Sequence, residues 1–184
     1  MIDWNQTYKD GRDYRASHPV FIDAVIKELG ARPGDRAVDV GCGTGDLARK
    51  LTRKGLDVTA IDPSSEAIRI ARSTSPNTIM FEVNNAADIK ADSYKWTVSK
   101  LVVAFVEDQA AFLKQLKNIT QDGGAVVIIT PVRFPDIEYG SKYNNISVDH
   151  AAFMTLCGTI FENAQEFHRD YIDESACTCT FILA

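Results

Sequence analysis

Apolar residues along this chain form two patterns that alternate from residue 19 to the C-terminus. Short runs rich in Val, Ile and Ala are typical of buried strands, and longer segments with apolar residues every three or four positions are typical of helices on a core. The predicted strands are 37–40, 58–61, 78–83, 96–99, 125–130, 166–171 and 178–183. The predicted helices are 19–29, 46–54, 63–71, 107–119 and 148–157.

This alternation favours one α/β domain over residues 1–184. Strands that alternate with helices in units of this length imply a parallel, doubly wound sheet. No internal repeat or interdomain linker interrupts the order. Two segments stand apart from it: a polar leader with aromatic inserts at 1–17, and an aromatic loop followed by a helix at 131–165.

The charge is distributed unevenly. The chain of 184 residues has a net charge of −5, and residues 131–184, with 3 Lys or Arg against 8 Asp or Glu, carry all of it. A nucleic-acid enzyme needs basic surface to meet phosphates, so we expect no nucleic-acid partner. No apolar run of membrane-spanning length and no signal peptide is found, so we expect a cytoplasmic protein without a membrane anchor.

The four cysteines predict neither a disulfide nor a metal site. They are Cys42, Cys157, Cys177 and Cys179, and they form no pair of C-x-x-C motifs, so no zinc is expected. Cys177 and Cys179 share one face of a predicted strand, which is poor placement for a disulfide. We interpret all four as reduced thiols.

A glycine-rich stretch at residues 38–48 is the candidate ligand loop. Three glycines at alternate positions join the strand at 37–40 to the helix that begins near residue 46. Glycines let the backbone turn sharply and approach a ligand, and the free N–H groups at the start of a helix face anionic groups. A strand, a glycine turn and a helix in this order form the context that a nucleotide-type loop requires.

Two ligands compete for this loop. A dinucleotide fingerprint G-x-G-x-x-G/A needs a small residue where Asp46 stands, which disfavours a NAD-dependent dehydrogenase. The sequence 39–45, D-V-G-C-G-T-G, resembles instead the first motif of class I S-adenosylmethionine-dependent methyltransferases. The resemblance implies a Rossmann-like domain with a mostly parallel seven-stranded sheet and an antiparallel C-terminal strand. It also implies S-adenosyl-L-methionine as cofactor and S-adenosyl-L-homocysteine as product.

The resemblance extends to other cofactor-binding positions. Asp62 matches the family's acid at the end of the second strand, which holds the ribose hydroxyls; the alternative is a helix N-terminal carboxylate. Residues 84–89 resemble the motif that contacts adenine, and residues 94–108 the fourth strand and its turn. The implied cofactor contacts are Asp39, Gly41, Cys42, Gly43, Gly45, Asp62, Pro63, Asn85, Ala86, Ser99 and Leu101, with Tyr8 and Arg15 closing from the leader.

Departures from the family pattern leave a second class of protein possible beside an enzyme. Asn85 replaces an acid that accepts from adenine, Lys95 stands where Asp is usual, and Ala104-Phe105 replaces a frequent histidine pair. A non-catalytic S-adenosylmethionine-binding or partner protein with the same fold is therefore the main alternative to an enzyme.

The acceptor site is expected in the segment after the fifth strand, where this family builds it. Tyr139 and Tyr143 are candidate pocket residues and His150 is a candidate base. Methyl transfer by direct displacement needs alignment and exclusion of water, and no metal. The acidic charge of this segment favours a small neutral or cationic acceptor. Whether the protein is a homodimer stays open.

Overall fold

The fold is built on one sheet. The computed structural model describes residues 2–12, 19–134, 146–173 and 176–184. Seven strands follow one another across the sheet in the order β3-β2-β1-β4-β5-β8-β7, and β6 pairs only with β5. In chain order the strands are β1 Arg36–Val40, β2 Asp57–Asp62, β3 Met80–Val83, β4 Tyr94–Lys100, β5 Thr120–Arg133, β6 Val148–Asp149, β7 Ala164–Asp173 and β8 Ala176–Leu183.

The strand directions confirm the predicted sheet. Strands β1 to β5 pair in parallel, whereas β8 is antiparallel to both β5 and β7. The strand directions and the Rossmann-like architecture therefore agree with the prediction, and the order of the strands across the sheet is added by the structure. The two-residue strand β6 was not predicted, because Val148 and Asp149 look like the first turn of the helix that follows them.

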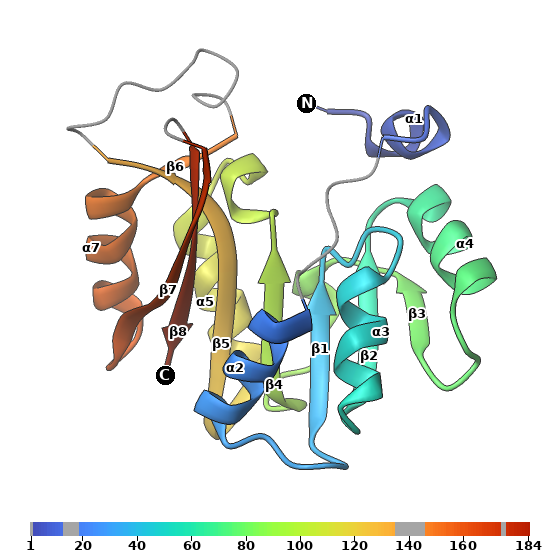
Figure 1. The fold of residues 1–184 in the computed structure, drawn as a ribbon, viewed down its shortest axis with the longest axis horizontal. Helices are drawn as coiled ribbons and strands as arrows, with labels where there is room; N and C mark the ends of the chain where they lie inside the picture. Colours follow the sequence, from blue (N-terminus) through green and yellow to red (C-terminus); the bar gives the residue numbers. More distant parts are fainter. Residues whose placement is uncertain (1, 13–18, 135–145, 174–175) are drawn as a thin grey trace.

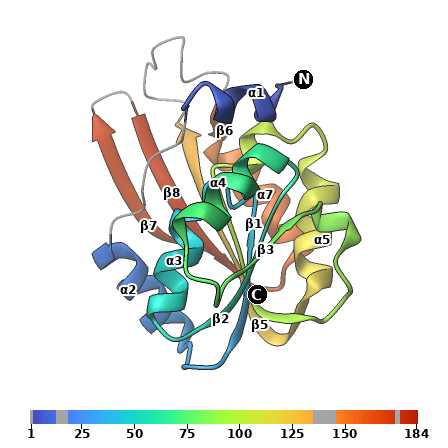
Figure 2. The ribbon, with the colours of Figure 1, turned by 90° about the vertical axis from the view of Figure 1, so that its right-hand side faces the viewer.

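Helices cover both faces of the sheet (Figures 1 and 2). Buried residues of α2, α3 and α4 pack on one face, and those of α5 and α7 pack on the other. The helices are α1 Trp4–Lys9, α2 Pro19–Leu29, α3 Asp46–Arg53, α4 Ser65–Thr74, α5 Gln109–Ile119 and α7 His150–Ile160, with short 3-10 helices η1 Ala86–Asp88 and η2 Val103–Phe105.

The predicted end of the last helix is wrong. The helix over 148–157 was expected to stop at Gly158, but α7 runs from His150 to Ile160. A glycine inside a helix costs only about 1 kcal/mol, and burial of Phe153, Cys157 and Phe161 on the sheet offsets that cost. Asp149 caps the start, because its carboxylate accepts from the Ala152 N–H at 2.8 Å.

Part of the N-terminal leader is an ordered helix. The Asp3 carboxylate caps α1 by accepting from the Gln6 N–H at 3.0 Å. In Figure 1, α1 lies at the upper right, above the start of α4 and beyond the carboxyl ends of the parallel strands. Arg15, which was also expected to act from this leader, lies outside the described residues.

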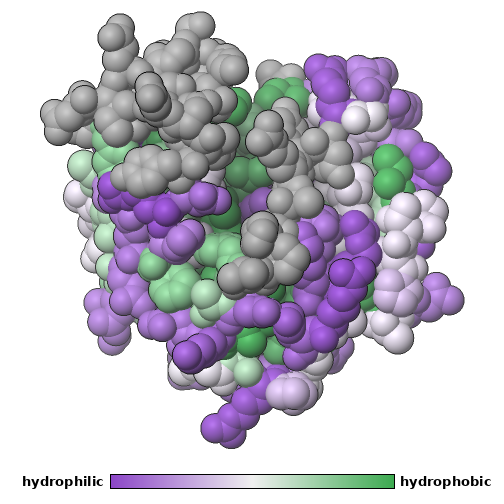
Figure 3. All heavy atoms as spheres, in the orientation of Figure 1, coloured by the Kyte–Doolittle hydropathy of each residue, from purple (hydrophilic) through white to green (hydrophobic). Residues whose placement is uncertain are grey.

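Polar side chains cover the part of the surface where α3 lies, at the right of the face shown in Figure 3. This agrees with the amphipathic pattern of α3, which buries Leu47, Ala48 and Leu51. Over the ranges that the structure describes, no helix is both long and apolar enough to span a membrane.

Candidate active site

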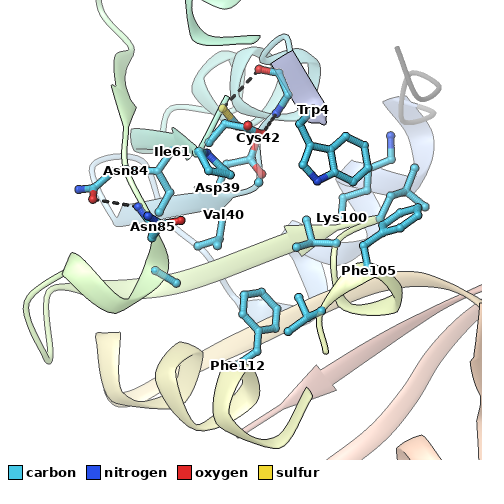
Figure 4. A pocket seen from close by; sticks show the side chains of 18 of the residues that line it. Trp4, Asp39, Val40, Cys42, Ile61, Asn84, Asn85, Lys100, Phe105 and Phe112 are labelled. Atoms are coloured by element: carbon cyan, nitrogen blue, oxygen red, sulfur yellow. Dashed lines mark hydrogen bonds between the residues drawn. The ribbon is translucent and has the colours of Figure 1, made fainter. Parts of the chain in front are cut away.

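A pocket of about 590 Å³ lies at the carboxyl ends of β1, β2 and β4, and Trp4 and Tyr8 of α1 line it from the other side. In open α/β sheets, ligands bind at this edge. Its lining includes the predicted residues Tyr8, Asp39, Gly41, Cys42, Gly43, Asp62, Pro63, Asn85, Ala86 and Leu101. Ten of the positions expected from the sequence thus come together around one cavity, part of which is shown in Figure 4.

The glycine loop folds onto the end of β2. The Gly41 and Cys42 N–H groups both donate to the Ile61 carbonyl, at 2.8 and 2.9 Å. Gly43 has φ +52°, and a Cβ at this position would lie 2.8 Å from the Tyr8 hydroxyl oxygen. The absence of a side chain at Gly43 therefore lets α1 approach the loop closely.

Asp62 connects the loop to the next helix. Its two carboxylate oxygens accept from the Gly43 N–H at 2.9 Å and from the Ser64 N–H at 2.8 Å. The cap of α4 is Ser64, whose hydroxyl accepts from the Ala67 N–H at 3.1 Å, so Asp62 itself is not the capping residue. Burial raises the pKa of Asp62, and the two N–H bonds oppose this increase. Because a carboxylate oxygen accepts two hydrogen bonds, both oxygens retain capacity for a ligand hydroxyl.

Asp39 carries an unsatisfied buried oxygen at the end of β1. Its side chain is almost fully buried and lines the pocket. Among the described residues, its Oδ2 has no hydrogen-bond partner. Burial raises the pKa of Asp39 to about 7, although the nearby charge of Lys100 lowers it. An unpaired buried carboxylate oxygen is costly, so this atom indicates a donor group on a ligand.

We predict that Asp39 makes the ligand-free protein less stable as pH rises. The folded-state pKa of about 7 exceeds the ordinary value of 3.8, so between about pH 4 and pH 7 the folded chain holds a proton that the unfolded chain has lost. The unfolding free energy should therefore fall with rising pH in this window, by at most about 1.4 kcal/mol per pH unit from this group.

Urea unfolding of the parent and of Asp39→Asn at several pH values in that window is the measurement. In Asp39→Asn, the unfolding free energy should no longer show the part of its fall with pH that comes from Asp39. The control is Asp57→Asn, an exposed residue at the opposite end of β2. Equal slopes in the parent and Asp39→Asn would contradict the assignment of the raised pKa to Asp39.

Aromatic side chains from three elements form one wall of the pocket. Trp4 of α1 packs edge to face on Phe105 of η2, with ring centroids 5.1 Å apart, and Phe112 of α5 lines the same cavity (Figure 4). The sequence did not identify Phe105 and Phe112 as site residues. For Phe105 the available signal was that Ala104-Phe105 departs from the histidine pair of the motif that residues 94–108 resemble; Phe112 had been interpreted only as a core residue.

The loop after β3 forms the opposite end of the pocket. The Asn85 N–H donates to the Asn84 side-chain oxygen at 2.9 Å, as drawn in Figure 4. The Gln115 side-chain amide donates to the Ala86 carbonyl at 3.0 Å and ties this loop to α5. Leu101 lines the pocket with φ +59°, which is uncommon for a residue other than glycine.

Helix α1 is held over the pocket by a polar contact. The Asn5 side-chain oxygen accepts from the Ser64 hydroxyl at 2.8 Å and from the Glu66 N–H at 3.2 Å, at the start of α4. These contacts attach α1 to the element that follows Asp62. Tyr8 and Trp4 are thereby positioned on the pocket side of α1.

Several predicted site residues lie elsewhere. Ser99 is buried between β1 and β4 and donates to the Val40 carbonyl at 3.1 Å, and it is not part of the pocket lining. Gly45, with φ +83°, packs at the start of α3, where a Cβ would lie 2.7 Å from the Phe81 ring. Tyr139 and Tyr143 fall outside the described residues.

His150 is also separate from the pocket lining. It begins α7, and its Nε2 lies 2.6 Å from Glu166 Oε2 on β7. Its ring stacks near Phe134, with centroids 4.6 Å apart. A base must reach the proton that it removes, and this arrangement directs the Nε2 of His150 toward Glu166.

The fold and pocket define an α/β protein with a ligand site at the carboxyl edge of a Rossmann-like sheet. A family model described as a methyltransferase domain matches residues 14–182. The chain therefore belongs to the methyltransferase domain family.

Curated relatives share part of their length with this chain. The ubiquinone biosynthesis O-methyltransferase of Xanthomonas campestris pv. campestris is 31% identical over 126 residues, covering 65% of this chain and 52% of the relative. That of Acinetobacter baylyi is 25% identical over 139 residues, covering 72% and 58%. The chain thus spans about half the length of the curated relatives it matches.

Solved structures show the same fold at low sequence identity. A SAM dependent methyltransferase from Aquifex aeolicus superposes with a TM-score of 0.73 at 14% identity and covers 100% of both chains. Magnesium protoporphyrin IX methyltransferase from Synechocystis PCC 6803 with bound SAH gives a TM-score of 0.74 at 16% identity, over 98% of this chain and 96% of that chain.

Proposed function

We propose that the protein is an S-adenosyl-L-methionine-dependent methyltransferase that acts on a small-molecule acceptor. The observation that carries this proposal is the pair of buried carboxylates, Asp39 and Asp62, on adjacent strand ends with the glycine turn between them. Asp39 offers an oxygen without a partner among the described residues. Membership in the methyltransferase domain family supports the same activity.

The residues present fit this cofactor. Asp62 would accept from the two ribose hydroxyls, since both of its oxygens retain acceptor capacity. Asn85 and Ala86 would contact the adenine, and the loop at 41–43 would back onto the methionine portion. The Asp39 oxygen would accept from a donor of that portion. S-adenosyl-L-homocysteine would be the product.

The cofactor supplies a methyl group on a sulfonium, with a neutral thioether as leaving group. The residues of this chain align the acceptor and exclude water, and such alignment supplies roughly 7–11 kcal/mol. Trp4, Phe105 and Phe112 provide the apolar wall for this role. A general base would add about 10²–10⁴-fold for an acceptor that must lose a proton. His150 remains a prediction for that base, and Tyr139 and Tyr143 remain predictions for the acceptor pocket.

We predict methyl transfer to a metabolite rather than to a nucleic acid. Residues 131–184 carry the whole net charge of −5, and a polyanion that approaches them meets like charge. The measurement is a labelled-methyl assay on a metabolite pool beside tRNA, rRNA and duplex DNA, with a gel-shift control. Label in nucleic acid, or a shift that weakens steeply with salt, would contradict the prediction.

A non-catalytic S-adenosylmethionine-binding protein is the second candidate, favoured by Lys95 and Phe105 at positions that differ from the family pattern. Calorimetry with S-adenosylmethionine, S-adenosylhomocysteine and NAD separates these classes. Cofactor binding without transfer to any acceptor supports the second candidate. NAD binding would support a dehydrogenase, which Asp46 disfavours at the loop.

A cytoplasmic location and a homodimer are further proposals. The location is supported by the free thiols of all four cysteines, because disulfides are rare in that compartment.

Exposed Met80 and Val83 on the edge strand β3 offer an apolar surface to a second copy. Sedimentation of the purified chain tests the oligomeric state.

A further inference from the structure

Three metal-binding side chains converge on the sheet face that α5 and α7 cover, away from the pocket lining, and a fourth lies beside one of them. His150 begins α7, Glu166 lies on β7, and Cys177 and Cys179 lie on β8. Ligand atoms of His150, Glu166 and Cys179 all lie within 4.8 Å of one another. The Cys177 and Cys179 sulfurs are 3.9 Å apart.

A bulge in β7 produces part of this arrangement. Residues three apart on a regular strand point to opposite faces. The register of β7 against β8 shifts between Glu166 and His168, and an extra residue of this kind redirects the side chains that follow it. As a result Arg169 and Glu166 share one face, and the Arg169 Nε and Nη2 atoms donate to the two Glu166 oxygens at 2.8 and 2.9 Å.

We propose that His150, Glu166, Cys177 and Cys179 bind one divalent zinc-type ion. Imidazole, carboxylate and thiolate are the ligands that zinc takes, in tetrahedral sites of four. Two thiolates on one such ion, with Zn–S bonds of about 2.3 Å, lie about 3.8 Å apart, and the two sulfurs here are separated by 3.9 Å. His150 Nε2 and Glu166 Oε2, which now lie 2.6 Å apart in a hydrogen bond, would move apart to about 3.3 Å to ligate the same tetrahedral ion.

The charge balance favours a divalent ion. Two thiolates and one carboxylate carry three negative charges, and their thiol protons pass to solvent on binding. The guanidinium of Arg169, held by Glu166 and lying 4.2 Å from the Phe134 ring centroid, offsets one of these charges. A divalent cation offsets the other two. Arg169 would then orient the coordinating carboxylate, as outer-shell partners of metal ligands do.

The site has a route from solvent and a structural consequence. The His150 and Glu166 side chains are each 21% exposed, whereas both cysteines are buried. An ion would enter between the histidine and the glutamate, with a rotation of the Cys177 thiol toward it. It would tie the start of α7 to β7 and β8. Four protein ligands leave no open position, so the site would be structural, and the metal-bound His150 would not serve as the base for methyl transfer.

The test is Co²⁺ and Zn²⁺ titration of chelator-treated, tag-free protein. We expect one ion per chain and a cobalt–thiolate charge-transfer band. Cys179→Ser should weaken binding by about 100-fold or more, since even outer-shell changes cost 10–100-fold. His150→Gln and Glu166→Gln should also weaken binding, and they test the proposal independently if Cys179→Ser does not fold.

Matched controls come from the same elements. Cys157→Ser removes a buried thiol of α7 outside the cluster, and His168→Gln removes a histidine of β7 that packs against Phe21 on the other face. Zinc should raise the melting temperature of the parent and of both controls, but not of the ligand variants. The proposal would be overturned if the protein shows no saturable metal binding, or if Cys157→Ser and Cys179→Ser bind the metal equally well. Either result stands apart from the outcome of the methyl-transfer assays.

Discussion

Replacing Asp62 by alanine is expected to weaken S-adenosylmethionine binding by about 100-fold. Hydrogen bonds to a charged group contribute about 1.5–3 kcal/mol, or about 10–150-fold in dissociation constant. The upper part of this range applies because Asp62 has two roles. Its oxygens would accept from the ribose, and they already hold the Gly43 and Ser64 N–H groups that shape the loop and the start of α4.

Calorimetry on the parent, Asp62→Ala and Asp62→Asn measures this effect. The amide of the Asn variant retains one accepting oxygen but turns a donor toward one of the two backbone N–H groups, so we expect about a 10-fold loss. Asp57→Ala is the control, because this aspartate lies exposed at the other end of the same strand. If Asp62→Ala binds the cofactor as the parent does, Asp62 only shapes the loop.

The sequence predicted those parts of the site that are local in the chain. The glycine turn, Asp39 and Asp62 occur at strand ends, and parallel strands bring their carboxyl ends to one edge of the sheet. Short apolar runs located the strands at those ends, because a doubly wound sheet buries both of its faces. For this reason the fold and the part of the pocket that these residues line could be predicted together.

Contacts between distant segments could not be predicted in this way. Asn5 meets Ser64 across 59 positions of the chain, and no periodicity marks such a pair. The packing of Trp4 on Phe105 likewise depends on where α1 docks. The cluster of His150, Glu166 and Cys179 was not expected, because cysteine spacing alone was considered. The bulge in β7 and the start of α7 bring Glu166 and His150 to the Cys179 thiol.

Replacing Gly43 by valine is expected to abolish detectable cofactor binding, a loss of more than about 100-fold, or about 2.7 kcal/mol. The left-handed φ of +52° is unfavourable for a β-branched residue. The added side chain would also lie between the loop and the Tyr8 hydroxyl, where the Cβ alone comes within 2.8 Å. It would therefore occupy the pocket and push α1 away from the loop.

A matched glycine separates these two causes. Gly34 also has positive φ, +87°, but a Cβ there meets no atom within 4 Å, so Gly34→Val carries backbone strain without obstructing the pocket. Melting temperature and calorimetry on both variants should show comparable destabilisation, with cofactor binding lost only in Gly43→Val. In Gly43→Ala, the Tyr8 hydroxyl oxygen is the atom nearest to the added Cβ. The double variant Gly43→Ala, Tyr8→Phe lacks this oxygen and should regain part of the affinity for the cofactor. Parent-like affinity in a folded Gly43→Val protein would exclude the loop from the site.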